Sequence, residues 1–304
     1  MAKTKVAVIG TGALGSIHAK LYSTISNVEL IGLCDINKNR VEKLSKELGV
    51  TGFTDFRDII GKADAASVAV PTKDHFKISK SLLEAGVHLL IEKPITQTLD
   101  EANKLLQIAE KKKLTLAVGH IERFNSAIEA IHKIKGDIKF IECHRLGPFV
   151  DRIKDVGVVL DLMIHDIDII LDLIKSPIKK IDAVGVKILS KHEDIANARL
   201  TFKNGAICNI TASRVTNKPM RKIRMFQPNA YISLDYIKQD AVIYTKRLGR
   251  ISHRQIDIKK ENSLLKELKS FIDCVKSGNK PLVSGIEGRN ALDIATQVLE
   301  KIRK

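Results

Sequence analysis

The stretch Lys5-Val6-Ala7-Val8-Ile9-Gly10-Thr11-Gly12-Ala13-Leu14-Gly15-Ser16 decides the fold, because an apolar run leads directly into a glycine-rich turn. The turn reads G-x-G-x-x-G between a predicted strand and a predicted helix, the setting in which this motif binds dinucleotides. Gly10 permits the tight turn, Gly12 leaves room for a pyrophosphate, and Gly15 lets the helix pack close to the strand. The N–H groups that open the helix would face the phosphates. We therefore expect the whole motif to bind the dinucleotide: Gly10, Thr11, Gly12, Ala13, Leu14 and Gly15.

An acidic residue about 20 positions after the motif supports the same prediction. Asp35 follows the apolar run 28–34, at the expected end of a second strand. A carboxylate there accepts a hydrogen bond from a ribose hydroxyl and repels a 2′-phosphate, which favours NAD over NADP. Asn37, Lys38 and Arg40 follow closely, and basic side chains at this place can accommodate the phosphate instead. The order of strand, glycine turn, strand and acid predicts bound NAD.

Length and composition limit the classes of protein to which the chain can belong. Its 304 residues suffice for two domains, each with its own core. The hydrophobic content of 44% is that of a globular protein, and no apolar run is long enough to span a bilayer. The first strand begins directly after residues 1–4, which leaves no room for a signal peptide. We therefore expect a cytoplasmic protein with no membrane insertion.

The net charge of +16 and the four cysteines could each indicate a function or have none. Basic proteins can bind nucleic acid, but the lysines are spread along the chain, and aromatic residues make up only 4%, so no stacking platform is indicated. A basic field would instead attract an anionic substrate. The cysteines lie far apart and form no C-x-x-C pair, which indicates reduced thiols. We expect neither a nucleic-acid partner nor a bound metal.

The sequence pattern changes near His120, and this change predicts two domains. Before it, strand-like and helix-like segments alternate, which is typical of a doubly wound parallel sheet. After a long apolar helical segment at 155–175, strand-like runs follow one another, and Asn204-Gly205 between two of them indicates a hairpin. We predict an α/β protein with an N-terminal NAD-binding Rossmann domain over 1–120. The second domain, over 121–304, is a predicted α+β domain with an open, mainly antiparallel sheet for substrate binding and oligomerisation.

The predicted open sheet presents apolar side chains on a face that no helix is expected to cover. Ile207, Ile210 and Val242 are too apolar for a face that is fully covered by water. We therefore expect self-association through this sheet, into a homodimer or a homotetramer.

Four loops fall where a Rossmann sheet presents its ligand, beyond the carboxyl ends of its strands. They are the glycine-rich turn and the segments 69–75, 91–94 and 119–125. Any one of them could be an ordinary capped loop, but four that converge on one crevice favour a cofactor site. Further cofactor contacts are therefore assigned to Val70, Pro71, Thr72, His75, Glu92, Lys93, Pro94 and Arg123.

Lys93 is the strongest candidate for a catalytic residue in these loops. It lies in Glu92-Lys93-Pro94 at a strand end, where a lysine is poorly placed as a simple solvated charge. It could donate to a substrate hydroxyl or stabilise an alkoxide as it forms. The alternative is a Glu–Lys pair that only orders the loop.

The segment 159–168 places polar residues in an otherwise apolar helix. Asp161, His165 and Asp168 stand at i, i+4 and i+7 and therefore share one helix face. A histidine near a carboxylate is a credible general base, the same spacing suits metal ligands, and a lone buried histidine is often only structural. Together with Lys93, the pattern favours catalysis. We therefore expect Lys93, Asp161 and His165 to be catalytic and to contact the substrate.

Together these motifs resemble the Gfo/Idh/MocA oxidoreductases, the family of glucose–fructose oxidoreductase and inositol dehydrogenase. The resemblance covers essentially the whole chain and rests on the glycine turn, Asp35, and the segments 71–75, 92–94 and 161–165. It implies that Lys93 is the active-site lysine, with a cis bond to Pro94, and that the nicotinamide lies against the loops 69–75 and 92–94. It further implies that Asp161 and His165 contact the reacting sugar hydroxyl. Met163 departs from the family's frequent glycine and is expected to shape the sugar pocket.

The segments 119–125 and 147–152 resemble nucleotide-sugar members of this family, the UDP-N-acetylglucosamine 3-dehydrogenases. Those oxidise the 3-hydroxyl so that a partner aminotransferase can install an amine in bacterial lipid A synthesis. The resemblance implies NAD-dependent oxidation of a UDP-N-acetylhexosamine, with an aminotransferase as the functional partner. The second domain offers Arg145, Arg152, Arg214 and Lys218, of which some could clamp a diphosphate. Three alternatives stay open: a dehydrogenase of a free polyol or hexose, an enzyme that uses NAD without net NADH formation, as in redox-assisted glycoside cleavage, and a non-catalytic NAD-binding regulatory protein.

Overall fold

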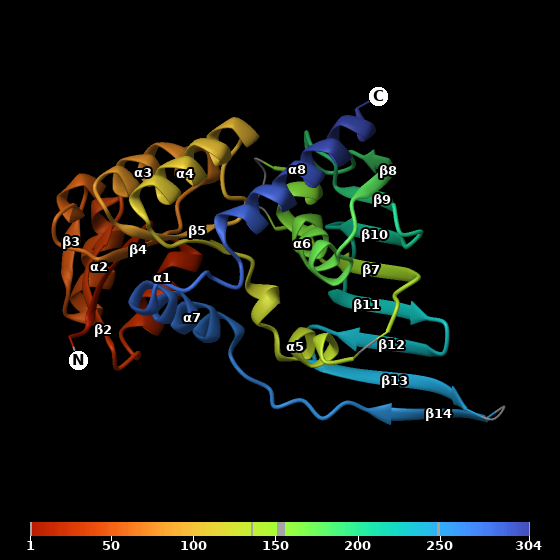
Figure 1. The fold of residues 1–304 in the computed structure, drawn as a ribbon. Coiled ribbons are helices and arrows are strands. Elements are labelled where there is room, and N and C mark those ends of the chain that lie inside the picture. The colour runs from red at the N-terminus through yellow and green to blue at the C-terminus, as the bar shows by residue number, and fades with distance from the viewer. Residues whose placement is uncertain (1, 135, 151–155, 248–249, 304) are drawn as a thin grey trace. The chain divides into compact units, whose positions relative to one another are not determined.

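The computed structural model describes residues 2–134, 136–150, 156–247 and 250–303 (Figure 1). The chain divides into two compact units. Unit 1 comprises Met1–Ile121 and Ser263–Arg289, and unit 2 comprises Glu122–Asn262 and Asn290–Lys304. The division near residue 120 agrees with the prediction, but the structure differs from it at 263–289, which belong to unit 1.

Helix α7 (Ser263–Ser277) explains the return of the chain to unit 1. Its apolar side chains Leu264, Leu268, Phe271 and Ile272 are buried in the same core cluster as Val8 and Ala19 of the N-terminal segment. Burial of several large apolar side chains is worth roughly 1.5–3 kcal/mol each. The sequence shows an amphipathic helix at this place but does not show which core its apolar face covers.

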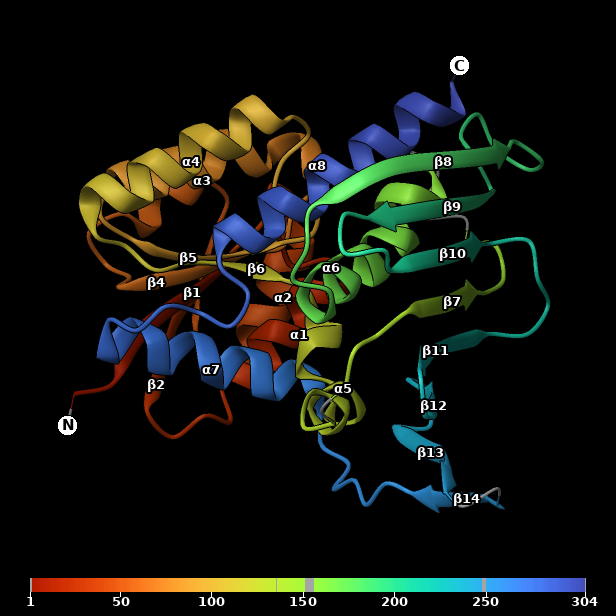
Figure 2. The same cartoon turned by 45° about the vertical axis from the view of Figure 1, so that its right-hand side comes forward.

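Unit 1 is built on a six-stranded parallel sheet in the order β3-β2-β1-β4-β5-β6. Its strands are β1 (Thr4–Ile9), β2 (Val28–Cys34), β3 (Thr51–Phe53), β4 (Ala65–Val68), β5 (His88–Glu92) and β6 (Leu116–Gly119). Helices cover both faces: α1 (Ala13–Tyr22), α2 (Lys38–Leu48) and α7 lie on one, and α3 (Thr72–Glu84) and α4 (Leu99–Lys112) on the other (Figure 2). A 3-10 turn, Phe56–Ile59, follows β3. This is the predicted doubly wound fold.

Local sequence signals define the helix ends in unit 1. Asn37 caps α2 by accepting from the N–H of Arg40, and Gly49 ends this helix in the left-handed region at φ +67°. Thr98 and Glu101 form a capping box at the start of α4. Such caps satisfy backbone groups that have no partner inside the helix.

Unit 2 contains an eight-stranded sheet in the order β14-β13-β12-β11-β7-β10-β9-β8. All neighbouring strands are antiparallel except β7 and β10, so the predicted mainly antiparallel sheet is confirmed. The strands are β7 (Phe140–Leu146), β8 (Ile178–Val186), β9 (Ile195–Phe202), β10 (Ile207–Ser213), β11 (Met220–Gln227), β12 (Ala230–Asp235), β13 (Asp240–Arg247) and β14 (Arg250–Gln255). The predicted hairpin at Asn204-Gly205 joins β9 to β10, with Gly205 at φ +86°.

Helices cover one face of this sheet (Figure 1). They are α5 (Ser126–His132), α6 (Ile164–Leu173), a π-helical segment that leads into α6 (Val159–Met163), and the part of α8 (Gly285–Ile302) from Asn290 onward. A 3-10 turn, Ile121–Phe124, leads into α5. Among the described residues, no helix is long and apolar enough to cross a membrane.

The open face of the sheet differs in detail from the prediction. Ile210 is fully buried on the helix-covered face, because Ile207 and Ile210 are three positions apart and side chains alternate along a strand. Ile207 and Val242 are only half-buried. Ile207, paired with Phe140, and Val242, two positions from Tyr244, lie on the open face as predicted. This face also carries a row of neighbouring rings across five strands, with centroids 4.9–5.8 Å apart: Phe140, Phe226, Tyr231, Tyr244 and His253.

Candidate functional site

A hollow of about 830 Å³ lies in unit 1 beyond the carboxyl ends of β1, β2 and β4. This is the place where open parallel sheets bind their ligands. Of the residues that the sequence predicts for the cofactor, five line this hollow: Gly10, Gly12, Asp35, Val70 and Pro71. The glycine turn, the acidic strand end and the loop after β4 are thus brought together within one unit.

The glycines leave space where a diphosphate would lie. Gly10 has φ +91°, and a Cβ there would lie 2.5 Å from the carbonyl oxygen of Ala69. A Cβ on Gly15 would overlap the carbonyl oxygen of Gly10, so helix and turn pack through these two glycines. A Cβ on Gly12 would meet nothing within 4 Å, and α1 begins there without a side-chain cap. The start of α1 therefore offers backbone N–H groups to an anion, in the arrangement that binds phosphate.

Asp35 is a buried acceptor at the edge of this hollow. The N–H and hydroxyl of Thr11 donate to its Oδ2 at 2.8 and 2.9 Å, and the N–H of Asn37 donates to Oδ1 at 2.9 Å. Arg40 Nη1 lies 3.4 Å from Oδ2. Burial raises the pKa of Asp35, but these hydrogen bonds and the Arg40 charge outweigh it and hold the pKa below its ordinary value. An ionised Asp35 can accept from a ribose hydroxyl and also fixes Thr11 at the centre of the turn.

Ile36 is a residue of the hollow that sequence reasoning missed. Its side chain is 95% exposed although it is large and apolar. An exposed isoleucine beside Asp35 offers an apolar contact surface to a flat ring such as adenine. The only signal in the sequence was an apolar residue directly after the acid, which in isolation is unremarkable.

His75 joins two of the predicted cofactor loops and does not line the hollow. Its ring nitrogens each lie 2.9 Å from a backbone carbonyl oxygen, Nδ1 from that of Pro94 and Nε2 from that of Val70. Burial lowers the pKa of His75, against the raising effect of these carbonyls. The histidine therefore braces the loop after β4 against the loop after β5. In the latter, the Lys93–Pro94 bond is cis, as expected.

Glu92 turns into unit 1 rather than toward the hollow. Its Oε1 lies 3.2 Å from Nε2 of the buried His18, and its Oε2 accepts from the Lys93 N–H at 3.3 Å. A Cβ on Gly119 would lie 2.8 Å from Oε1, so the carboxyl rests against the end of β6. These contacts anchor the strand end from which Lys93 projects.

Glu267 on α7 is a second buried acid of this region, and no local sequence signal marked it. It is 2% exposed. Burial raises the pKa of Glu267 well above its ordinary value, and the charge of Glu92 raises it further. The Glu267 carboxyl therefore keeps its proton to a higher pH than an exposed glutamate does.

The raised pKa predicts a pH-dependent gain in stability for Glu267→Gln. The unfolded chain releases this proton above about pH 4.5, while the folded state retains it, so the wild-type folded state loses stability as pH rises from there toward the folded pKa. Glutamine removes the effect. We expect the melting temperature of Glu267→Gln to match the wild type at pH 4.5 and to exceed it at pH 8. An equal difference at both pH values would contradict this account. Exposed Glu47→Gln in α2 serves as the control.

In unit 2, the predicted catalytic helix begins with a π-helical segment. Asp161 lies within Val159–Met163, and His165 follows at the start of α6. π-Helical turns inside α-helices occur frequently at functional sites. Asp161 and His165 remain partly exposed. Met163 is fully buried in the core of unit 2, so its side chain presents no surface to a ligand.

Asp168, the third polar residue of the predicted helix face, is buried and paired with an arginine. It is 2% exposed, and its Oδ1 lies 3.4 Å from Arg123 Nη1. Arg123 Nη2 lies 3.0 Å from Asp172 Oδ1. Arg123, predicted to contact the cofactor, is therefore buried and paired with two carboxylates of α6.

Arg145, predicted to clamp a diphosphate, is likewise committed to carboxylates. It is 3% exposed. Its Nε and Nη2 donate to the two oxygens of Asp166 at 2.9 Å each, and its Nη1 donates to Glu122 Oε1 at 2.8 Å. Burial raises the pKa of Glu122, but Arg145 outweighs this and holds the pKa below its ordinary value. The three side chains form a buried ionic triad that spans β7, α6 and the turn before α5.

Arg214 is also held within unit 2. Its Nε donates to Asp194 Oδ1 at 2.7 Å, its Nη2 to Ser190 Oγ at 2.7 Å, and its Nη1 to the carbonyl of Val156 at 2.9 Å. Arg152, the third arginine predicted for the substrate, lies outside the described residues. Neither Arg145 nor Arg214 presents its guanidinium to a ligand in this geometry.

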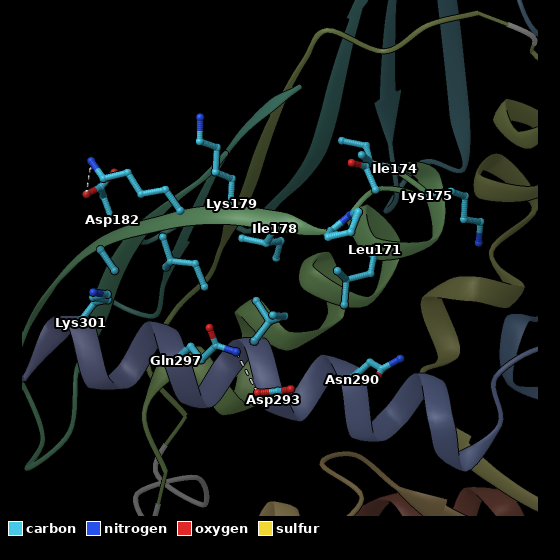
Figure 3. Close-up of a pocket in the computed structure, with 16 residues that line it drawn as sticks. Leu171, Ile174, Lys175, Ile178, Lys179, Asp182, Asn290, Asp293, Gln297 and Lys301 are labelled. Atoms are coloured by element: carbon cyan, nitrogen blue, oxygen red, sulfur yellow. Dashed lines mark hydrogen bonds and ion pairs between the residues drawn. The ribbon is translucent and has the colours of Figure 1, made fainter. Parts of the chain in front are cut away.

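A second hollow, of about 1000 Å³, lies in unit 2 between the end of α6, β8 and α8 (Figure 3). Leu171, Ile174 and Ile178 give it apolar walls, and lysines stand around them. Two pairs of its polar side chains bind each other: Gln297 donates to Asp293 at 2.9 Å, and Lys180 lies 2.9 Å from Asp182. None of the residues predicted to carry chemistry lines it.

Two family models match the chain. The first is described as "Oxidoreductase family, NAD-binding Rossmann fold" and matches residues 4–120. The second is described as "GFO/IDH/MocA C-terminal domain" and matches residues 127–232. Together they cover most of both predicted domains.

Curated proteins and solved structures give the same picture. The chain is 34% identical to UDP-N-acetylglucosamine 3-dehydrogenase of Acidithiobacillus ferrooxidans over 98% of its own length and 97% of that protein. A solved structure of that dehydrogenase superposes with a TM-score of 0.94 and covers 99% of this chain and 98% of its own. Myo-inositol 2-dehydrogenase of Thermotoga maritima is 27% identical over 95% of this chain and 93% of its own. Levoglucosan dehydrogenase, solved in complex with NADH and L-sorbose, shares the fold at 18% identity, with a TM-score of 0.89 over 100% of this chain and 97% of its own.

Proposed function

Because the chain belongs to the Gfo/Idh/MocA family of oxidoreductases, we propose that it oxidises a ring hydroxyl of a UDP-N-acetylhexosamine, with NAD⁺ as the hydride acceptor. The observation that carries the substrate is the 34% identity to a UDP-N-acetylglucosamine 3-dehydrogenase over nearly the full length of both chains. The 3-hydroxyl of UDP-N-acetylglucosamine is therefore the first position to test.

The residues of unit 1 fit NAD. The open space at Gly12 and the uncapped start of α1 suit the diphosphate, and the ionised Asp35 suits an adenosine ribose. Ile36 suits the adenine ring. When bound, NAD⁺ supplies a two-electron acceptor at the nicotinamide.

Asp35→Asn tests this assignment of the cofactor. Asparagine keeps the size of the side chain but loses the negative charge, and hydrogen bonds to charged groups contribute roughly 1.5–3 kcal/mol. We expect the dissociation constant for NAD to rise by about 10- to 100-fold, as measured by calorimetric titration. The control is Asp58→Asn, an exposed carboxylate after the same part of the sheet. An affinity within twofold of the wild type would remove Asp35 from the cofactor site.

In the proposed mechanism, the residues of this chain move the proton and stabilise the charge. His165 accepts the proton of the ring hydroxyl, a role in which histidine is the side chain most often used. Asp161 orients the sugar or the imidazole. The Lys93 ammonium stabilises the negative charge that develops on the oxygen. In an alternative form of this mechanism, Lys93 accepts the proton and His165 stabilises the charge on the oxygen.

The assay that tests the function follows NADH absorbance. Purified protein is mixed with NAD⁺ and UDP-N-acetylglucosamine, and an aminotransferase with an amine donor removes the product. Absorbance that depends on the nucleotide sugar supports the proposal, whereas its absence with bound NAD⁺ confirmed would contradict it. Free myo-inositol and N-acetylglucosamine run in parallel, because the 27% identity to a myo-inositol 2-dehydrogenase keeps a polyol as the second candidate. A regulatory protein without catalysis would bind NAD⁺ and turn over none of them.

We also propose that the protein forms a homodimer or homotetramer through the open face of the unit 2 sheet. The row from Phe140 to His253 supports this, because adjoining aromatic rings on an uncovered sheet face are typical of buried interfaces. Tyr231→Glu should then lower the mass found by light scattering. A monomeric wild type at micromolar concentration would contradict the proposal. We further propose that the protein is cytoplasmic, since NAD and nucleotide sugars are made there. We also propose that an aminotransferase acts on its product in lipid A synthesis.

A further inference from the structure

We propose that Glu193 is a positioning residue, which together with Arg214 holds the start of the helix that carries Asp161 and His165. The proposal rests on the proposed function of these two residues. Its evidence lies entirely in unit 2, in the turn between β8 and β9 and in residues 156–159.

The catalytic helix has no cap of its own. Residues 156–159 read Val-Gly-Val-Val, and the helix begins after Val158 without a side-chain hydrogen bond. The first N–H groups of any helix lack partners inside that helix and usually receive them from a nearby Ser, Thr, Asp or Asn. Residues 156–159 contain none of these, and among the described residues the partners of Val158 and Val159 come from elsewhere in the chain.

Glu193 supplies them from another element. Its carbonyl oxygen accepts from the Val158 N–H at 3.0 Å, and its side-chain Oε1 accepts from the Val159 N–H at 3.2 Å. The residue is only 8% exposed. A negative group at a helix start also interacts favourably with the helix dipole. Two consecutive N–H groups, two and three residues before Asp161, thus depend on one residue.

Gly157 shows how closely the carboxyl fits. A Cβ at this position would overlap the Glu193 carboxyl, so only glycine allows the chain to pass over it. The carbonyl of Gly157 in turn accepts from the Asp161 N–H at 3.1 Å. The contact of Glu193 with Gly157 is therefore connected to Asp161 through one hydrogen bond.

Arg214 holds the same segment from the preceding residue, by its bond to the carbonyl of Val156. Its guanidinium is fixed by Asp194, which also accepts from the N–H groups of Ile188, Leu189 and Ser190 at 2.6–2.9 Å. Burial raises the pKa of Asp194, but these donors outweigh it and hold the pKa far below its ordinary value. The turn between β8 and β9 is thus held by its own hydrogen bonds. Glu193 in this turn binds the N–H groups of residues 158 and 159, and Arg214, which is paired with Asp194, binds the carbonyl of residue 156.

Two variants of Glu193 separate the effect of side-chain length from the effect of its negative charge. Glu193→Gln keeps an acceptor oxygen at the same distance, and Glu193→Asp keeps the charge but shortens the side chain by one methylene group. We expect Glu193→Gln to retain kcat within about threefold and Glu193→Asp to lower it about tenfold or more, since small displacements of catalytic groups have effects of this size. The dissociation constant for NAD should stay within twofold in both. Glu142→Asp, an exposed carboxylate paired with Arg224, is the matched control.

A double substitution provides a second, independent test. Gly157→Ala should lower kcat in the wild type, because the new methyl group displaces the Glu193 carboxyl. In a Glu193→Ala background, the same substitution should have little further effect. Equal effects of Gly157→Ala in both backgrounds would overturn the proposal, as would a kcat of Glu193→Asp within twofold of the wild type.

Hydrogen exchange distinguishes this proposal from the proposed function. The amide of Val159, whose acceptor is the Glu193 side chain, should exchange at least about tenfold faster in Glu193→Asp than in Glu193→Gln, with or without any sugar present. If the wild type oxidises none of the sugars tested, the proposed function fails while this measurement still decides the role of Glu193. Unchanged exchange in Glu193→Asp would overturn the inference even if the enzyme is active.

Discussion

Replacement of Lys93 or His165 by alanine is expected to lower turnover at least about tenfold, and up to about 10⁴-fold where proton transfer is lost, while NAD still binds. In the proposed mechanism the ring hydroxyl must lose a proton before or as hydride leaves the same carbon. Without His165 the proton has no positioned acceptor. Without Lys93 the developing negative charge has no fixed cation to stabilise it.

The measurement needs two readouts, single-turnover rates and calorimetric titration of NAD. Lys104→Ala, an exposed lysine of α4, controls for the loss of one positive charge in unit 1. The assignment is refuted if both alanine variants turn over at the wild-type rate. A loss of NAD binding in Lys93→Ala would instead indicate that the loop after β5 serves the cofactor more than the reaction.

Replacement of Arg145 by alanine is expected to lower the free energy of unfolding of unit 2 by about 3–5 kcal/mol. The substitution leaves Asp166, 1% exposed, buried without the arginine that binds both of its oxygens. Glu122, 7% exposed, keeps as a counter-charge the half-exposed Arg221, whose Nη1 lies 3.6 Å from its Oε1. Removal of one partner from a buried ionic group is costly because the remaining charges stay desolvated. Denaturant or thermal unfolding, followed for unit 2, provides the measurement.

Arg224→Ala is the matched control for Arg145→Ala. Arg224 also pairs with a carboxylate of a neighbouring strand, Glu142, but the two side chains are 45% and 31% exposed. Exposed pairs contribute about 0–1 kcal/mol. Arg145→Met combined with Asp166→Asn and Glu122→Gln should recover much of the lost stability, because no charge then remains buried. Equal losses in Arg145→Ala and Arg224→Ala would show that the triad contributes nothing special.

The features that follow from local rules could be predicted from the sequence. The glycine turn needs small residues at fixed positions, and a strand buried on both faces needs a continuous apolar run. Both can therefore be recognised from the local sequence, without knowledge of the residues that they contact. The same holds for the hairpin at Asn204-Gly205 and for Asp35 at a strand end. The change near residue 120 from alternating elements to successive strands sufficed to predict the two kinds of sheet.

The roles of the arginines could not be predicted, because they depend on partners far away in the chain. Arg145 meets Asp166 21 residues later and Glu122 23 residues earlier. The sequence shows an arginine that could bind a phosphate, but whether its guanidinium is already occupied is decided by the packing. Glu193 and Glu267 were missed for the same reason, since neither lies in a motif or a helical pattern with the residues it affects.

The surroundings of Asp161, His165 and Asp168 could not be predicted from their helical spacing, for a different reason. The prediction assumed a regular α-helix, whereas a π-helical segment precedes α6. Hydrophobic periodicity does not distinguish a short π-helical turn from an α-helical one. Asp166, which lay outside the predicted face, is buried against Arg145, and Asp168 is buried against Arg123.

The bond between Thr11 and Asp35 bears on how cofactor preference could change in descendants of this chain. A smaller neutral residue at position 35 would admit a 2′-phosphate, but it would also leave the N–H and hydroxyl of Thr11 without their acceptor in a buried place. Such a variant is expected to lose order in the glycine-rich turn at the same step at which it gains room for a 2′-phosphate. A switch to NADP in this lineage therefore requires paired substitutions at positions 11 and 35, and single-site redesign should yield a weaker binder of both cofactors.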